Sequence, residues 1–289
     1  MKKALVVLLT GAMMMASVAC GGGNASQPAP EAKEEAAEET AEETAEETTD
    51  EGQAAEAEAG AGSEEVEMNV PEDPMSHADY MAAEVDTEVV IAGYIQGIQK
   101  MSEGEDQTFT NVYLQDENGG YFVYQLECTP KEYELLEVGK KLKLKGYKSE
   151  WSGEIEVTDA VWQFEDGEWK AEPEDVTALL GTEDLAAKQN MLVSFKGMTV
   201  ESAGKNDAGE DVPYLYNWDG SGTEGDDLYF NVSLNGQTYS FTVESDLCAA
   251  DSEVYAAVKN LKIGDVVDME GFLYWYEGPN PHITKVTVQ

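Results

Sequence analysis

Asn118-Gly119-Gly120-Tyr121-Phe122-Val123-Tyr124 decides the fold, because a second version of it, Asn235-Gly236-Gln237-Thr238-Tyr239-Ser240-Phe241, stands later in the chain. In both versions Asn-Gly separates two runs in which apolar and polar residues alternate. Alternation is typical of a β-strand with one buried face. Asn-Gly suits a two-residue turn because both turn positions need positive φ. Each stretch therefore predicts a β-hairpin.

The segments on either side of the two hairpins match in order and spacing, which indicates an internal repeat. Before the hairpins, Met81-Ala82-Ala83 and a strand ending at Gly93 correspond to Leu185-Ala186-Ala187 and a strand ending at Gly197. After the hairpins, further features correspond in the same order. They are a short helical pattern at 131–136 and 252–261, then Val138-Gly139 leading to Gly146-Tyr147 and Ile263-Gly264 leading to Gly271-Phe272, and a last strand at 157–160 and 283–286.

Each copy of the repeat reads as three strands, a helix and two strands. This order resembles the OB fold, a five-stranded barrel, and the resemblance rests on the pattern because OB folds carry no signature motif. We expect a mainly β protein with two tandem five-stranded OB-like barrels, at 76–172 and 173–289, each with a short helix between strands three and four. The second copy carries an inserted loop at 202–227. A two-sheet sandwich is the structural alternative.

The first residues of the chain carry an export pattern. Ser17-Val18-Ala19-Cys20 closes an apolar run that begins after Lys2-Lys3, which is typical of a signal peptide and too short for a membrane span. The tetrapeptide resembles the lipobox of bacterial lipoproteins, whose Cys is acylated, for example with palmitate. The resemblance implies a signal peptide at 1–19, a lipid on Cys20, and a place on the extracytoplasmic side of the cell membrane (the outer membrane if the host has one). A plain secreted protein is the alternative.

Composition separates a linker from the folded part. The chain has 59 Asp and Glu against 17 Lys and no Arg, for a net charge of −42. Residues 20–75 contain Ala-Glu-Glu-Thr units and no aromatic residue, so we expect a disordered acidic linker. Phosphate recognition commonly uses Arg, and nucleic acid binding needs a positive surface. We therefore expect nucleic acid to be an unlikely partner.

Catalytic and metal-binding motifs are weak in this sequence. His77 and His282 fall in different copies, outside any nucleophile motif, and Cys128 and Cys248 fall in separate domains, which makes a disulfide improbable. We therefore expect no enzyme activity and no cofactor, with a hydrolase as the alternative. Calcium is the better metal candidate, because acidic residues at 206–211 and 219–227 lie among glycines, although their order does not fit an EF-hand loop.

Aromatic residues expected in the loop between strands four and five are the main candidate ligand contacts. In OB folds this loop borders the ligand face. Exposed aromatic rings stack on sugars, bases or peptide side chains. The alternative is that these rings bury against the barrel end or the neighbouring domain. The candidates are Tyr147 and Trp151 in the first copy, and Tyr274, Trp275 and Tyr276 in the second.

Lys143 and Lys145 complete the candidate site. They belong to a basic cluster on strand four of the first copy, whereas their counterparts in the second copy are Asp268 and Glu270. A solvated strand face is one interpretation. The other is that the lysines meet an acidic partner, the linker, or the acidic strand of the second barrel.

These features together predict a lipid-anchored, extracytoplasmic and non-enzymatic binding protein. Its partners would be the membrane, through the lipid on Cys20, and a protein, peptide or glycan at the cell envelope. The alternative from another class is a structural module that assembles an envelope complex.

Overall fold

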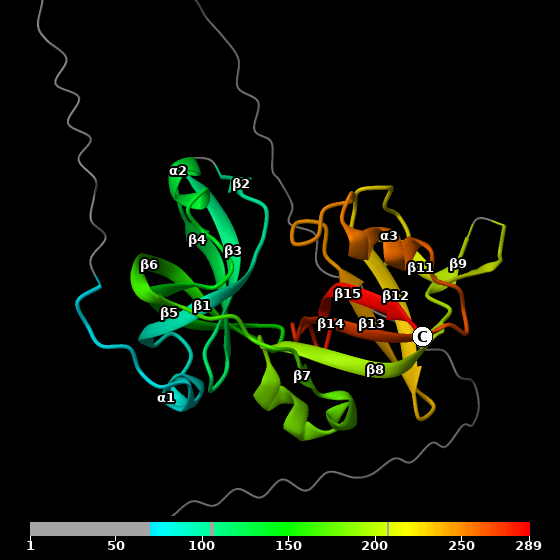
Figure 1. The fold of residues 1–289 in the computed structure, drawn as a ribbon, viewed down its shortest axis with the longest axis horizontal. Coiled ribbons are helices and arrows are strands. Elements are labelled where there is room, and N and C mark those ends of the chain that lie inside the picture. Colours follow the sequence, from blue (N-terminus) through cyan, green and yellow to red (C-terminus); the bar gives the residue numbers. More distant parts are fainter. Residues whose placement is uncertain (1–69, 105–106, 207) are drawn as a thin grey trace, which may run out of the picture. The chain divides into compact units, whose positions relative to one another are not determined.

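The computed structural model describes residues 70–104, 107–206 and 208–289 (Figure 1). The signal peptide, Cys20 and most of the linker lie outside these residues and stay predictions. The described residues belong to one compact unit. Val70, near the end of the predicted linker, is buried, and its N–H donates to Gln163 Oε1 at 2.8 Å. The first barrel therefore already has a contact at residue 70.

Five strands close the first barrel (Figure 1). β1 pairs with β3 and β5, β5 pairs with β6, and β4 pairs with β3. The closing pair, β4 with β6, is parallel. This is the strand order of an OB barrel, and it confirms the predicted fold class. The strands are β1 (Glu88–Ile98), β3 (Thr108–Gln115), β4 (Gly120–Glu127), β5 (Lys140–Trp151) and β6 (Glu154–Glu168), with a short β2 (Ser102–Glu103) beside β3.

The second barrel repeats this topology. β8 pairs with β12 and β14, β14 with β15, and β12 with β13, while the parallel pair β13 with β15 closes the ring. The strands are β8 (Leu192–Glu201), β12 (Leu228–Leu234), β13 (Gln237–Val243), β14 (Val266–Phe272) and β15 (His282–Val288), with a short β7 (Glu174–Asp175) beside β8.

Short helices lie at matching places in the two barrels. α2 (Pro130–Tyr133) follows strand three of the first barrel, and α3 (Glu253–Lys259) follows strand three of the second. α1 (His77–Ala82) precedes the first barrel, while the 3-10 turns η1 (Thr177–Leu179) and η2 (Glu183–Lys188) precede the second. Ser76 caps α1, since its Oγ accepts the Asp79 N–H at 3.1 Å.

Each barrel has its own apolar core, built from alternate strand residues. Ile91, Leu114 and Leu142 are fully buried in the first core, as are Phe195, Phe230 and Phe241 in the second. A third, smaller cluster joins the barrels and consists of Tyr113, Phe122 and Phe272. The alternating pattern that predicted the strands is therefore the pattern that fills the cores.

The two Asn-Gly hairpins differ, and the prediction for the first was wrong in detail. Asn235 and Gly236 have φ of 53° and 80°, as a two-residue turn requires. Asn118 and Gly119 are not in this conformation, because the first hairpin turns over residues 116–119 and Asp116 Oδ1 accepts the N–H groups of both. An Asx-type side-chain bond has replaced positive φ as the means of turning the chain.

Glycine at the matched positions 146 and 271 has one cause in both barrels. The strand-four register shifts at each of them. A Cβ at Gly146 would lie 2.6 Å from the Thr158 carbonyl oxygen, and one at Gly271 would overlap the His282 carbonyl oxygen. Strand five thus approaches strand four so closely that only glycine fits.

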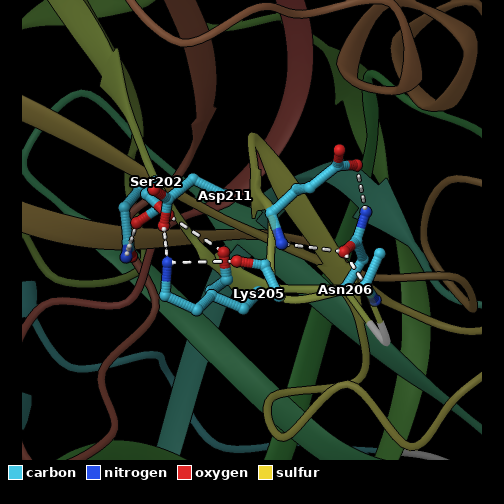
Figure 2. A network of polar contacts seen from close by, with 9 residues as sticks. Ser202, Lys205, Asn206 and Asp211 are labelled. Atoms are coloured by element: carbon cyan, nitrogen blue, oxygen red, sulfur yellow. Dashed lines mark hydrogen bonds and ion pairs between the residues drawn. The ribbon is translucent and has the colours of Figure 1, made fainter.

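The inserted loop of the second barrel contains regular secondary structure. It contains a hairpin of β9 (Gly204–Lys205) and β10 (Asp211–Val212), followed by β11 (Tyr214–Tyr216), which pairs with β12. Figure 2 shows the polar contacts that hold the hairpin, including Lys205 Nζ at 3.0 Å from Asp211 Oδ1. On its other side the Asn206 side chain bonds the N–H and the carboxylate of Glu210.

Candidate ligand-binding site

The strand-four-to-five connections of the two barrels lie side by side. In the first barrel this connection is the turn Ser152-Gly153, and in the second it is the loop at 273–281. The Glu277 N–H donates to the Ser152 carbonyl oxygen at 2.7 Å. The rings of Trp151 and Tyr276 are 5.1 Å apart. The fold therefore brings together two loops that the sequence places in separate domains.

The candidate aromatic side chains differ in exposure. Trp151 and Tyr147 are 52% and 45% exposed. Both lie on β5 rather than in the loop where they were expected, because strand four extends to residue 151. Tyr276 is half-buried, and Trp275 is half-buried against the core of the second barrel. Trp151, Trp275 and Tyr276 lie where the two loops meet, and we call these three the loop aromatics.

Tyr274 is not an exposed contact residue, in contrast to its role in the predicted site. Its ring stacks on His282 with centroids 4.3 Å apart and meets the edge of Phe122 at 5.5 Å. Burial raises the pKa of its hydroxyl far above the ordinary value. The alternative of packing between the domains is correct for this residue.

The two candidate lysines are paired within the chain. Lys143 is 9% exposed and its Nζ lies 3.3 Å from Glu165 Oε1. Lys145 lies 3.1 Å from Glu72 and 3.0 Å from Glu88. Glu72 falls in the predicted linker, so one described linker residue does meet the lysine cluster. Ligand binding by the lysines stays a prediction, and these pairs would have to open for it.

The corresponding acids of the second barrel also have partners of their own. Glu270 pairs with Lys285 at 2.8 Å. Asp268 accepts the Gly197 N–H and the Gln289 amide, each at 2.8 Å. Among the ion pairs of the described residues, none joins the lysines of the first barrel to these acids.

Two adjoining hollows lie beside strand three of the second barrel. The first, of about 350 Å³, lies between β13, the residues at and near η2, and the loop at 273–281. The second, of about 560 Å³, lies between the β12–β13 hairpin and η1. Gln237 and Tyr239 line both hollows, and Trp275 lines the first. One of the loop aromatics therefore borders a space large enough for part of a ligand.

A buried polar network joins the barrels next to the loop aromatics. Glu154 is fully buried, and its Oε2 accepts the Trp275 N–H at 2.8 Å. Burial raises the pKa of Glu154 to about 8 and that of Glu156 to about 7. The contact surface between the barrels, which includes Tyr113, Phe122 and Phe272, is called the seam below. Across it, the Tyr113 hydroxyl lies 3.0 Å from His282 Nδ1. The carboxylates are thus enclosed by protein.

The histidines and cysteines have structural surroundings. His77 Nε2 lies 3.2 Å from the Gly120 carbonyl oxygen, and burial lowers the pKa of its imidazole. Cys128 and Cys248 are free thiols, and burial raises the pKa of each to about 11. A thiol with a raised pKa is a poor nucleophile at neutral pH.

The acids named for calcium bond to other parts of the chain. Asp227 accepts the Ser245 N–H and hydroxyl, and Asp226 accepts the Thr223 N–H. Within 70–104, 107–206 and 208–289, no group of three or more His, Cys, Asp or Glu could hold a metal ion. Asp207 lies outside these residues. Helices long and apolar enough to cross a bilayer are likewise lacking in that part of the chain.

Sequence reasoning missed the seam and the hollows. Glu154 and Glu156 could not be singled out among 59 acidic residues, because nothing in their local sequence marks them as buried. The hollows could have been inferred from one signal. The repeat aligns His77 with Gly181, so a large side chain in the first copy has no counterpart in the second.

Comparison with family models and with curated proteins finds no match for this chain. Solved structures do resemble it. The p202 HIN1 domain in complex with 12-mer dsDNA has 9% identity and a TM-score of 0.33, covering 71% of this chain and 94% of that one. A murine DNA-binding protein bound to dsDNA has 13% identity and a TM-score of 0.32, covering 69% and 96%. A replication protein A heterotrimer bound to ssDNA has 9% identity and a TM-score of 0.28, covering 76% and 70%. Likeness at this level concerns the fold alone.

These neighbours correct one expectation. We expected nucleic acid to be an unlikely partner, yet the similar structures include domains that were solved with DNA. The expectation rested on the lack of Arg and the acidic composition, and it is contradicted by proteins of this fold bound to DNA. The exclusion is withdrawn. The likeness identifies no ligand for this chain.

Proposed function

We propose that this chain is a lipid-anchored, extracytoplasmic binding protein without catalytic activity, which recognises a protein, peptide or glycan at the cell envelope. The observation that carries the proposal is the meeting of the two strand-four-to-five loops. Trp151 and Tyr276 come from different barrels, and their ring centroids are 5.1 Å apart. Trp275 borders a hollow beside them. Aromatic side chains that are clustered and partly exposed are frequent hot spots for ligands.

A non-enzymatic role is supported by the state of the ionisable groups. The acids with the most strongly raised pKa, Glu154 and Glu156, are enclosed in the seam, where a substrate has no access. General acid–base catalysis needs such a group within hydrogen-bond reach of the substrate. Membrane anchoring is supported by the lipobox-like Ser17-Val18-Ala19-Cys20.

The binding part of the proposal is tested on the mature full chain with a glycan array and a library of short peptides. Replacing Trp151 and Tyr276 together by Ala should weaken binding about 30-fold, because paired aromatic hot spots commonly contribute 2 kcal/mol or more. Phe164→Ala is the control, since Phe164 is an exposed aromatic residue of β6 in the first barrel and is not among the candidate ligand contacts. Unchanged binding by the double variant would place the ligand elsewhere.

The anchoring part is tested separately in cells. Cys20→Ser should move the protein from the membrane fraction to the soluble fraction and abolish labelling with a fatty-acid analogue. Cys128→Ser is the matched control, because this thiol is buried in the first barrel and should leave both readouts unchanged. Retention of the Cys20 variant in the membrane would refute the lipid anchor.

A further inference from the structure

Strand β13 has one edge that β15 covers only at its far end. β12 pairs with all of β13, from Gln237 to Val243. β15 joins the other edge at a single position, Thr242 opposite His282. The Thr242 N–H donates toward this edge, to the Pro281 carbonyl oxygen at 3.0 Å.

The backbone of Thr238 and Ser240 points to the same edge. Along an antiparallel strand, alternate residues direct their N–H and C=O groups to the same side. The β12–β13 register is unbroken, so Thr238 and Ser240 share the direction of Thr242. Among the residues that the structure describes, neither has a backbone partner on that side. An edge of this kind is a template for another strand.

The open edge faces the smaller hollow. Thr238 and Ser240 line it from β13, with Leu185, Trp275 and Pro279 among the residues around it. The edge from Gln237 to Ser240 is about 13 Å long at ~3.3 Å per residue. Backbone groups in a row beside apolar side chains are what an extended peptide needs: hydrogen bonds for its main chain and contacts for its side chains.

The first barrel shows what happens where this edge is filled by the chain itself. Gly120 corresponds to Gln237, and its carbonyl oxygen lies 3.2 Å from His77 Nε2 on α1. The position equivalent to His77 is Gly181, which has no side chain and lines the hollow. The first barrel thus covers the beginning of its strand three with its own helix, and the second leaves a space at the same place.

Charge favours a particular kind of peptide. Asp175 is the one charged residue among those that line the two hollows. The whole chain has a net charge of −42. A peptide with Lys or Arg at its ends is attracted by this field, whereas an acidic one, including residues 31–60 of this chain, is repelled.

We propose that the second barrel binds a basic, extended peptide by adding it as a strand to the open edge of β13, beside Gly181 and Trp275. The inference narrows the proposed function to a peptide ligand and rests on it. Main-chain bonds to Thr238 and Ser240 supply the affinity, while Leu185 and Trp275 contact alternate side chains of the peptide.

The test is a binding assay of the mature full chain with a random library of peptides about nine residues long, flanked by lysines, which matches the edge with a margin on each side. The best binder is then N-methylated at one residue at a time. Strand addition predicts a loss of more than tenfold at alternate residues and little loss at those between. Equal loss at every position, or no binder at all, would overturn the proposal.

A protein variant gives a second readout. Thr238→Pro removes an N–H that the fold does not use and should abolish binding, while Thr238→Ala keeps the N–H and should bind as the wild type does. Thermal unfolding checks that both fold; if the Pro variant does not, the N-methyl series decides. Peptide binding that survives Thr238→Pro but fails on loss of Trp151 and Tyr276 would refute strand addition and leave the proposed function standing.

Two further probes define the occupant. A peptide of residues 31–60 and a short single-stranded DNA oligonucleotide are offered to the same protein. The proposal expects neither to compete with the basic peptide. Competition by the chain's own segment would assign the edge to the linker, and competition by DNA would assign it to nucleic acid; either result overturns the peptide assignment.

Discussion

Among single residues, Glu154 shows most clearly how the seam depends on protonation. Its Oε1 is buried without a hydrogen-bond partner, as is Asn190 Oδ1. Burial raises the Glu154 pKa, and this effect is larger than the lowering by the neighbouring Asn190 side chain. Both atoms accept hydrogen bonds, so they can bond to each other only when Glu154 carries a proton. The raised pKa of about 8, caused by burial, agrees with this geometry.

Stability should therefore fall as the pH rises. The folded protein keeps the Glu154 proton up to about pH 8, whereas the unfolded chain loses it near the ordinary value of 4.5. Unfolding then releases a proton between these values, which makes the free energy of unfolding decrease with pH in that window. Glu156, whose pKa is about 7, adds to the slope below pH 7. Urea titrations at a series of pH values measure this directly, and a flat profile would contradict it.

Glu154→Gln should remove most of that slope and stabilise the protein at pH 8 by a few kcal/mol, because an amide offers an N–H to Asn190 without a proton to lose. The readout is the midpoint of urea unfolding at pH 5 and pH 8. Glu150→Gln is the control, since Glu150 is an exposed residue of β5 and should leave the profile as it is.

Among elements, the two hairpins use glycine for different reasons. Gly119 leaves space for the His77 ring, which a Cβ would overlap, and its φ is not positive. Gly236 has a φ of 80° and open space around it. Glycine is thus needed for packing in the first barrel and for backbone conformation in the second.

Substitutions at these glycines should separate the two demands. Gly119→Ala should destabilise the protein by about 2 kcal/mol through overlap with His77, and His77→Ala in the same chain should recover much of that loss. Gly236→Ala should cost about 1 kcal/mol from backbone strain, with no such rescue. A double-mutant cycle in urea measures both. Additive effects of Gly119→Ala and His77→Ala would contradict the packing account.

The sequence predicted the elements better than their contacts. Local alternation, turn residues and the repeat were sufficient for five strands per barrel, because these signals depend on neighbours along the chain. The turn made by Asp116 was not predicted from the sequence, because an Asn-Gly turn at the next residues is equally plausible. Of the candidate site, Trp151 and Tyr276 do come together, whereas Tyr274 is packed in the seam. Contacts between the barrels produce no periodic pattern in the sequence of either copy, so they could not be predicted from it.

At the scale of the whole molecule, an aromatic stack couples the barrels. Tyr113 of β3 lies parallel to Phe272 of β14, with ring centroids 4.2 Å apart, and both are almost fully buried. Around them, Gln99 Nε2 of the first barrel donates to Glu244 Oε2 of the second at 2.5 Å. Apolar burial and a polar network at one seam favour a single cooperative unit.

Phe272→Ala should uncouple the barrels. Removing a buried ring costs about 3–5 kcal/mol, and here the loss falls on the contact between the barrels. The wild type should unfold in one calorimetric transition and the variant in two. Trp218→Ala, at an exposed residue of the inserted loop, should keep one transition and serves as the control. One transition at a lower temperature in the Phe272 variant would show that the barrels remain coupled without the stack.

The parallel strand pairs that close each barrel also suggest an order in which the two barrels fold. In each barrel the ring is complete only when strand five lies against strand three, and in the second barrel strand five is β15, at His282–Val288. During synthesis the first barrel can close while the second still lacks its last strand, since domains commonly fold from the N-terminal side. The finished surface of Tyr113 and Phe122 is then a template on which β14 and the loop after it settle. We therefore expect the first barrel to form first and to offer this surface to β14 as the second barrel closes.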